Sequence, residues 1–402
     1  MTDRRIAITG LGCVSAVGMT ADETWAGLKA GHCGIGPLTD RAEDLKVTIG
    51  GEIPGDITEG FPPRQLPALD PFTIIALRAA RQAMVQAGLT VEEDFATRVG
   101  CIIGVGYCGM HVVEEGYRNI FLHGGKRAHL MTVPRTMPVA PAGQISMEFG
   151  IKGPVYGVTS ACASANHAIG AGYQAIKAGL ADVVVVGGTD SPLIWGILKG
   201  WDALRVLAAD ACRPFSLNRR GLALADGAGV AVLERWDHAK ARGATILAEL
   251  AGAGMTADAA DLVMPGIDGP SRAIEQCLQS GDIAVGDVDY VNAHGTGTKA
   301  NDSTETKIIR KVFGGHADDL AVSSTKSMHG HALGGSGAIE LVACVNAINE
   351  GVVPPTVNYD EPDPDCDLDV TPNVMKKREI DVAISNSFAF GGTNAVIAVR
   401  KA

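Results

Sequence analysis

Residues 153–188, GPVYGVTSACASANHAIGAGYQAIKAGLADVVVVGG, predict a helix that leads into a buried strand. The segment opens with turn residues and small side chains, after which Ile169, Tyr173 and Ile176 recur at the spacing of one helix face. The run at 182–188 is rich in valine and closed by glycine, which is typical of a buried strand. Helices that alternate with such strands form an α/β protein.

The same alternation covers most of the chain. Apolar runs bounded by glycine predict further strands at 4–9, 99–104 and 228–234, and a helical pattern covers Pro71–Ala87. The second half repeats this order, with predicted strands at 245–254, 289–295 and 394–400 and predicted helices at 271–279 and 334–349. We therefore expect an α/β fold built from two related halves, residues 1–240 and 241–402.

The composition excludes several classes of protein. The 402 residues are 46% hydrophobic, which excludes a disordered chain, and the net charge of −11 leaves no general basic field for nucleic acid or anionic lipid. The nine cysteines form no C-x-x-C pair, so neither a zinc module nor a disulfide framework is indicated, and we expect a reducing, cytoplasmic location. Neither a membrane span nor a signal peptide is predicted.

Cys162 is the predicted nucleophile, because the pattern places it at the start of a helix. Free backbone N–H groups and the positive end of the helix dipole are expected to lower the pKa of its thiol, and the thiolate is the form that attacks. Ser160 and Ser164 lie beside it, but the G-x-S-x-G motif of serine hydrolases is absent. The alternative is that Cys162 is simply a small buried residue, as most cysteines are.

Two histidines and a lysine lie in glycine-rich segments where catalytic groups often collect. His294 is in VNAHGTGT, just beyond a predicted strand, and His331 is in STKSMHGHALGGSGAIE, at the start of a predicted helix. Neutral imidazole N–H groups can hold a thioester carbonyl while an enolate charge develops, and Lys326 can fix the protonation of a histidine through its charge. Taken singly, each histidine would more often be structural.

The segment SNSFAFGGTNAV, residues 385–396, predicts a turn with an exposed main chain. Phe388 and Phe390 flank one small residue, and the two glycines that follow permit unusual backbone angles. Backbone N–H groups in such a turn can form an oxyanion hole. Structural aromatic residues before an ordinary hairpin turn are the alternative interpretation.

Together these motifs resemble the signature of the β-ketoacyl-[acyl carrier protein] synthase family: Cys162 in TSACASANHAIG, His294 in NAHGTGT, Lys326 and His331 in TKSMHGH, and Phe390 in NSFAFGGTN. The resemblance covers essentially the whole chain and favours the elongating synthase I/II branch over the initiating synthase III branch, which uses a Cys-His-Asn set. It implies the thiolase fold, five layers ordered αβαβα from two related halves, an active site between them, and a homodimer.

The resemblance also implies the chemistry of the site. Cys162 accepts an acyl chain, His294 and His331 support decarboxylation of malonyl-acyl carrier protein, and Lys326 holds the environment of the second histidine. Backbone N–H groups of Cys162 and Phe390 supply the oxyanion hole. The acyl carrier protein is the expected partner, and neither a metal nor a redox cofactor is expected.

Further residues match the family by position. Thr296 and Thr298 match threonines that bind the phosphopantetheine arm, Phe388 and Phe390 match residues of the substrate gate, and Asp302 and Glu305 match acidic residues that support the site. Basic candidates for carrier-protein docking are Arg64, Lys126, Arg127, Arg205 and Arg213.

Departures from housekeeping members predict a specialised enzyme with an unusual acyl substrate. Ala389 stands where glycine is usual in the gate, and Tyr107, Met110 and His111 are bulkier or more polar than the usual acyl-pocket residues. His329 also departs, because threonine is common there. These choices resemble members of the nodulation protein E type.

Three other functions are compatible with parts of the sequence. An NAD(P)-dependent oxidoreductase is suggested by ITGLGCVSAVG, but Ser15 occupies the third glycine position of the dinucleotide motif. A non-catalytic partner subunit of the chain-length-factor type shares the fold, although such subunits typically replace the nucleophilic cysteine. A thiolase shares it too, and the two histidines and the threonines favour condensation on a carrier protein over that reaction.

Overall fold

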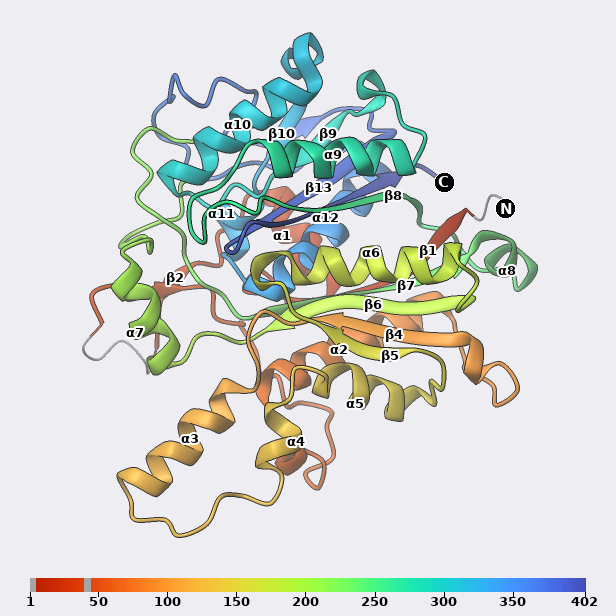
Figure 1. The fold of residues 1–402 in the computed structure, drawn as a ribbon, viewed down its shortest axis with the longest axis vertical. Helices are drawn as coiled ribbons and strands as arrows, with labels where there is room; N and C mark the ends of the chain where they lie inside the picture. The colour runs from red at the N-terminus through yellow and green to blue at the C-terminus, as the bar shows by residue number, and fades with distance from the viewer. Residues whose placement is uncertain (1–4, 40–44) are drawn as a thin grey trace.

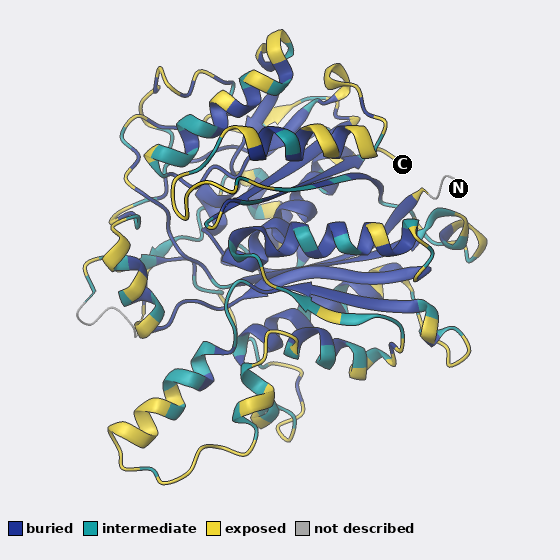
Figure 2. Cartoon of the chain, in the orientation of Figure 1, coloured by how far each residue is buried: buried dark blue, intermediate teal, exposed yellow. Residues whose placement is uncertain are grey.

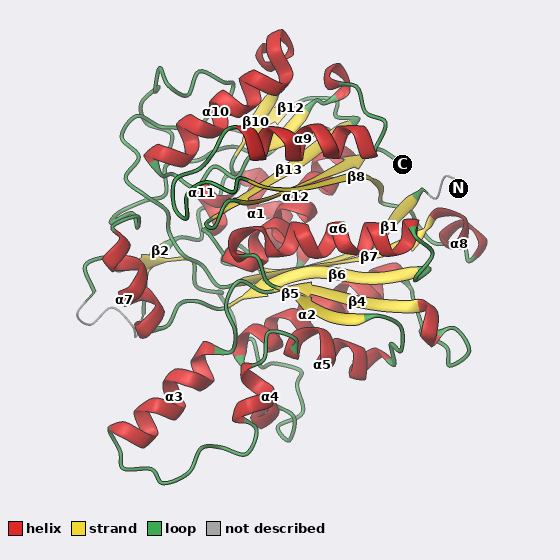
Figure 3. Cartoon of the chain, viewed as in Figure 1, coloured by secondary structure: helices red, strands yellow, loops and turns green. Residues whose placement is uncertain are grey.

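The computed structural model describes residues 5–39 and 45–402 and contains a ten-stranded mixed sheet flanked by helices (Figures 1 and 3). Its N-terminal strands are β1 (Ile6–Val14), β4 (Val99–Gly104), β5 (Val155–Val158), β6 (Val183–Asp190) and β7 (Gly227–Arg235). Its C-terminal strands are β8 (Ala248–Ala257), β9 (Tyr290–Asn292), β10 (Ala321–Ser323), β13 (Val382–Ala389) and β14 (Thr393–Arg400). Two small sheets pair β2 (Gly36–Pro37) with β3 (Ile49–Gly50), and β11 (Val352–Val353) with β12 (Lys376–Lys377).

The two halves of the large sheet have the same topology. The strand order is β10-β9-β13-β14-β8-β1-β7-β6-β4-β5, so in each half the order from the outer edge is third, second, fourth, fifth and first. The parallel and antiparallel neighbours are also the same, because β4 is parallel to β5 and β6 just as β9 is parallel to β10 and β13. Within the described part of the sheet, β1 and β8 join the halves through the residue pairs Ala7 with Glu249 and Ile8 with Ala248. The expected repetition of two related halves is visible in this order.

The two halves of the large sheet form two of the five layers, and helices form the other three (Figure 1). The central helices α6 (Ser164–Lys177) and α12 (Ser336–Glu350) contact strands of both halves, and α12 is buried along most of its length (Figure 2). A helix covered on all sides is apolar all round, which explains AIELVACVNAI within α12. The outer layers contain α2 (Pro71–Ala87) and α5 (Ala140–Phe149) on one side, and α9 (Asp268–Ser280) and α10 (Lys299–Phe313) on the other.

The remaining helices are shorter or peripheral: α1 (Ala21–Ala30), α3 (Met110–Phe121), α4 (Thr132–Thr136), α7 (Trp195–Leu204), α8 (Trp236–Ala241) and α11 (Lys326–His329). Of all the helices in the described ranges, none has the length and apolar character needed to cross a membrane.

The predicted end of the first strand at Gly10 is wrong, because β1 continues to Val14. A Cβ atom at Gly10 would lie 2.0 Å from the carbonyl oxygen of Ala83, and one at Gly12 would lie 1.8 Å from that of Ala79. The glycines therefore allow α2 to pack directly on the strand instead of ending it. Residues 155–158, expected as part of a turn-rich segment, form β5 at the sheet edge.

Candidate active site

Three side chains from separate parts of the chain meet in one cavity of about 200 Å³. Cys162 lies in a single 3₁₀ turn (Ala161–Ala163) that leads into α6, His294 follows β9, and His331 follows α11. One donor atom from each residue, the thiol sulfur or a ring nitrogen, lies within 4.8 Å of the others. The predicted nucleophile and the two predicted histidines are thus brought together.

The thiol of Cys162 is buried, with 6% of the residue exposed. Burial raises its pKa to about 12, although the charge of Lys326 and the backbone N–H groups of Cys162 and Phe390 lower it. The expectation that the helix start leaves this thiol with a lowered pKa is therefore wrong, because the loss of hydration outweighs those favourable contacts. The resting residue is a protonated thiol.

Both histidines are buried and neutral. Burial lowers the pKa of His294 and of His331 well below the usual value, and the nearby charge of Lys326 lowers each further. The two rings meet edge to face with their centroids 5.5 Å apart. Nδ1 of His294 and Nε2 of His331 have no hydrogen-bond partner among the described residues, so these atoms are available to a substrate.

The main chain of His331 is fixed on both sides. Its N–H donates to the carbonyl oxygen of Ala223 at 2.7 Å, and its own carbonyl oxygen accepts from the N–H of Ala225 at 3.0 Å. Its Nδ1 lies 2.9 Å from the hydroxyl of Ser336, at the start of α12. These contacts orient the ring toward Cys162.

Lys326 is the charged centre of the site and is 1% exposed. Its ammonium group pairs with the carboxylate of Glu340, which α12 contributes from a fully buried position. Glu340 was not predicted from the sequence, although an acidic residue within an apolar helical run is a recognisable signal. The cation also opposes a metal ion at Cys162, His294 and His331, because its positive charge reaches all three.

Two buried carboxylates shape the loop that carries His294. Glu305 accepts the backbone N–H groups of His294 and Gly295, each at 2.8 Å. Asp302 accepts the N–H of Phe215 at 2.8 Å and that of Gly297 at 3.2 Å. Both carboxylates therefore support the His294 loop, the role that the family resemblance implied for Asp302 and Glu305.

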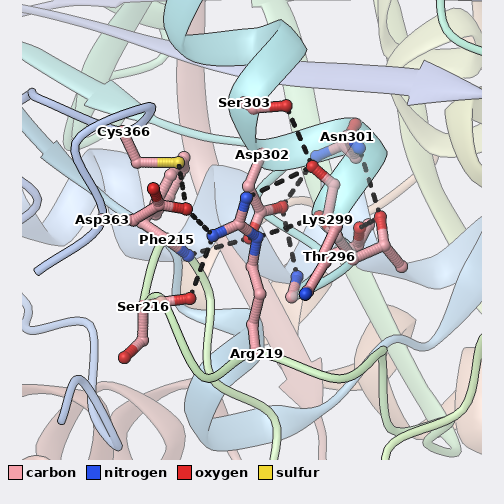
Figure 4. A network of polar contacts seen from close by, with 12 residues as sticks. Phe215, Ser216, Arg219, Thr296, Lys299, Asn301, Asp302, Ser303, Asp363 and Cys366 are labelled. Carbon is pink, nitrogen blue, oxygen red and sulfur yellow. Dashed lines mark hydrogen bonds and ion pairs between the residues drawn. The ribbon is translucent and has the colours of Figure 1, made fainter. Parts of the chain in front are cut away.

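Arg219 extends this network, as Figure 4 shows. Its guanidinium lies 3.6 Å from the carboxylate of Asp302, pairs with Asp363, and donates to the carbonyl oxygens of Thr298 and Lys299 at 3.3 and 3.2 Å. Arg219 is 3% exposed, so these pairings take the place of its hydration. The network anchors the start of α10 against the segment that follows α7.

Thr296 and Thr298 line the cavity. Their hydroxyl groups lie 3.0 Å apart, and Thr298 also caps α10 by accepting the N–H of Asn301. Leu262, Val263 and Met264 line the same cavity and are exposed, which places them at its mouth.

The segment 385–396 forms the hairpin of β13 and β14, with Gly391 and Gly392 at φ angles of 84° and 65°. Phe388 is buried against His294, and the half-buried Phe390 stacks on Trp201 with ring centroids 5.8 Å apart. Ala389, noted above for replacing glycine, has no positive φ, so alanine fits there without strain.

Two residues at the hairpin and the cavity were missed from the sequence. Asp258 accepts from Asn394 at 2.7 Å and donates its backbone N–H to the carbonyl oxygen of Gly392 at 2.8 Å, which fixes the turn. Trp201 donates its indole N–H to the hydroxyl of Tyr107 at 3.2 Å and lines the cavity. Met110 and His111, the first two residues of α3, instead line a separate surface hollow, so their prediction as acyl-pocket residues is not supported.

The family profile described as "Beta-ketoacyl synthase, N-terminal domain" matches residues 3–239, and the profile described as "Beta-ketoacyl synthase, C-terminal domain" matches residues 247–360. The chain belongs to the β-ketoacyl synthase family. Membership confirms the predicted thiolase fold and the predicted condensing, acyltransferase-type activity, and it excludes the oxidoreductase.

Individual relatives of this β-ketoacyl synthase cover almost its entire length. Nodulation protein E of Rhizobium sp. (strain N33) is 54% identical over 99% of this chain and 100% of its own. The 3-oxoacyl-[acyl-carrier-protein] synthase 2 of Synechocystis sp. is 39% identical over 99% of this chain and 98% of its own. A chain from the solved structure of a type II PKS acyl-carrier protein in complex with its ketosynthase superposes on this chain with a TM-score of 0.91. The two are 30% identical, and the match covers 99% of this chain and all of that one. The predicted likeness to synthase II and nodulation protein E types is confirmed.

Proposed function

We propose that this β-ketoacyl synthase joins an acyl chain held on Cys162 to a malonyl unit carried by an acyl carrier protein. The convergence of a buried thiol and two neutral imidazoles within 4.8 Å carries the proposal. The family supplies the reaction class, and the geometry supplies a role for each residue.

In the first half-reaction, Cys162 attacks the carbonyl carbon of an acyl-carrier thioester. The thiol gives up its proton, which leaves on the pantetheine sulfur as the old C–S bond breaks. A pKa of about 12 means that this proton must be removed during the attack, and His331 and His294 are the titratable side chains that lie beside the thiol. The backbone N–H groups of Cys162 and Phe390 stabilise the oxyanion.

In the second half-reaction, the malonyl thioester loses CO₂ and its C–C bonding electrons form an enolate. The ring N–H groups of His294 and His331 hold the enolate oxygen, which requires both rings to be neutral donors. Burial keeps both rings neutral, and the charge of Lys326 lowers the pKa of each further. The enolate carbon then attacks the Cys162 thioester, and the cysteine sulfur leaves with the electron pair.

The substrate arm enters through the mouth of the cavity. Thr296 and Thr298 offer hydroxyl groups to the amides of a phosphopantetheine arm, while Asp302 and Glu305 keep the threonine loop in place. Neither a resident metal nor a redox cofactor enters these steps. The gate residues Phe388 and Phe390 also line the cavity.

An acyl carrier protein and a second copy of this chain are the proposed partners. Arg64, Lys126, Arg127 and Arg205 are exposed and suit an acidic carrier protein, whereas Arg213 is already paired with Asp210 and Asp360. For the homodimer, β5 offers an open sheet edge, and α3 extends from the body and exposes Tyr117 and Phe121 (Figure 1). Nine free thiols support a reducing, cytoplasmic location.

A non-catalytic partner subunit is the second candidate function, since it shares the family. The intact arrangement of Cys162, His294, Lys326 and His331 argues against it. A thiolase reaction is tested separately, by offering acetyl-CoA instead of malonyl-carrier protein as the extender.

The division of the chain into two domains, residues 1–240 and 241–402, stays a prediction.

Intact-protein mass spectrometry tests the proposal directly. The wild type and Cys162→Ala are mixed with acyl-carrier proteins of several chain lengths, and malonyl-carrier protein is then added. We expect only the wild type to gain acyl mass and to release it as β-ketoacyl product, with saturated medium chains reacting slowest. Acylation of neither protein would favour the non-catalytic partner subunit.

A further inference from the structure

Asp190, at the end of β6, joins two loops of the active site through one buried carboxylate. It is 1% exposed. Its Oδ2 accepts the backbone N–H groups of Gly106 at 2.8 Å and of Gly334 at 2.6 Å, and its Oδ1 accepts that of Tyr107 at 2.9 Å. Gly106 and Tyr107 follow β4, whereas Gly334 lies between His331 and α12.

The two loops touch at this carboxylate. A Cβ atom at Gly334 would lie 2.2 Å from the backbone nitrogen of Gly106 and 2.7 Å from Oδ2 of Asp190, and one at Gly106 would lie 2.6 Å from the same oxygen. Side chains are therefore excluded from both positions. What holds the loops together is the carboxylate, because two backbone N–H groups that face each other need a shared acceptor.

Strained backbone lies on either side of this junction. Leu333, two residues after His331, has a φ of 44°, and Ala161, directly before Cys162, has a φ of 49°. Neither is glycine, so both conformations persist only because the surroundings hold them. A Cβ at Gly106 would lie 3.3 Å from the carbonyl oxygen of Ala161, which brings the nucleophile turn to the same junction.

We propose that Asp190 is a positioning residue that holds the Cys162 turn, the Tyr107 wall and the His331 loop in register for condensation. An amide cannot replace it, because three N–H donors converge on its two oxygens and an NH₂ group would face at least one of them. The proposal rests on the proposed function, since positioning matters only if these groups react together.

The test compares full-length Asp190→Asn with Glu234→Gln. Glu234 is a matched control, because it is also a fully buried carboxylate. It lies in β7 opposite Val183 in the strand register, at the other end of β6 from Asp190. Steady-state condensation is measured per folded molecule, and hydrogen exchange is followed in peptides that contain Gly106 or Gly334.

We expect Asp190→Asn to lower kcat roughly 10- to 100-fold with little change in KM for malonyl-carrier protein, the loss typical of a displacement of about 1 Å. Protection of both loops should fall together in this variant and stay unchanged in Glu234→Gln. Unchanged kcat with normal exchange, or loosening of one loop alone, would overturn the proposal. If the variant does not fold, wild-type exchange decides, since independent opening of the two loops contradicts a shared anchor. Absence of condensation in the wild type would instead refute the proposed function. The hydrogen-exchange data would still show whether Asp190 holds the two loops together.

Discussion

The ammonium group of Lys326 pairs with the carboxylate of Glu340 out of contact with solvent, and its charge acts on both active-site histidines. A lone buried charge is costly, so we expect Lys326→Met to destabilise the protein by about 3–5 kcal/mol. The double variant Lys326→Met/Glu340→Leu should recover most of that stability, because it leaves no unpaired charge. Urea unfolding of the three proteins measures this, and equal loss in the single and double variants would contradict it.

The same double variant should show a new dependence of activity on pH. In the wild type, burial first and Lys326 second lower the pKa of His294 and His331, so both stay neutral as the pH falls. Without the cation the pKa values of both rings rise, although burial still lowers them, so the loss of decarboxylation on the acid side should begin at a higher pH than in the wild type. The measurement is kcat/KM for malonyl-carrier protein against pH. Superimposable profiles would show that Lys326 does not act through the histidines.

Alkylation of Cys162 should be slow at neutral pH and accelerate with pH. Its pKa of about 12 leaves little thiolate, so the rate should rise about tenfold per pH unit through the whole accessible range. Iodoacetamide labelling of the Cys162 peptide, followed by mass spectrometry, provides the rate. The partly exposed Cys33 gives an internal comparison. A plateau below about pH 8 would mean that the thiol is already ionised.

The Arg219 network predicts a pH-dependent loss of stability. Burial raises the pKa of Asp302 from 3.8 to about 6, while the charge of Arg219 lowers it. When the pKa of a carboxyl is higher in the folded protein than in the unfolded chain, the free energy of unfolding falls as the pH rises between the two values. Arg219→Met should raise the folded pKa of Asp302 further, so its unfolding free energy should fall increasingly below that of the wild type as the pH rises above about 6, where only the wild-type carboxyl loses its proton. The exposed neighbour Arg220→Met is the control.

Much of the fold could be predicted because the strands and helices carry simple patterns. Apolar runs bounded by glycine correctly predicted β4 and β6, and the helix Pro71–Ala87 was predicted with its observed bounds. Glycine failed as an end signal in β1, because there it serves close helix packing and not a turn. The local sequence pattern does not show which face of a strand a neighbouring helix will cover.

The site was predictable in its members but not in its electrostatics. Cys162, His294 and His331 stand in distinctive motifs, and the structure brings them together. The pKa of Cys162 was predicted in the wrong direction, because burial depends on the whole fold whereas a helix start can be recognised locally. Asp190 was missed for a related reason, since its partners are backbone groups of glycines distant in sequence.

Trp201 should control which acyl chains reach Cys162. Its ring stacks on Phe390 at an interplanar angle of 20°, and its indole N–H is held by the hydroxyl of Tyr107, so the aromatic wall is fixed at two points. Trp201→Leu removes the stack and enlarges the cavity, and we expect longer or branched acyl-carrier proteins to acylate Cys162 faster than they acylate the wild type. Tyr107→Phe is the matched control, because it removes the hydrogen bond and keeps both rings. Its preferred chain length should stay unchanged, with a loss of stability of about 1 kcal/mol for the unpaired indole N–H. Acylation rates across a chain-length series, read by intact mass, compare the two variants, and an unaltered profile in Trp201→Leu would place the specificity elsewhere.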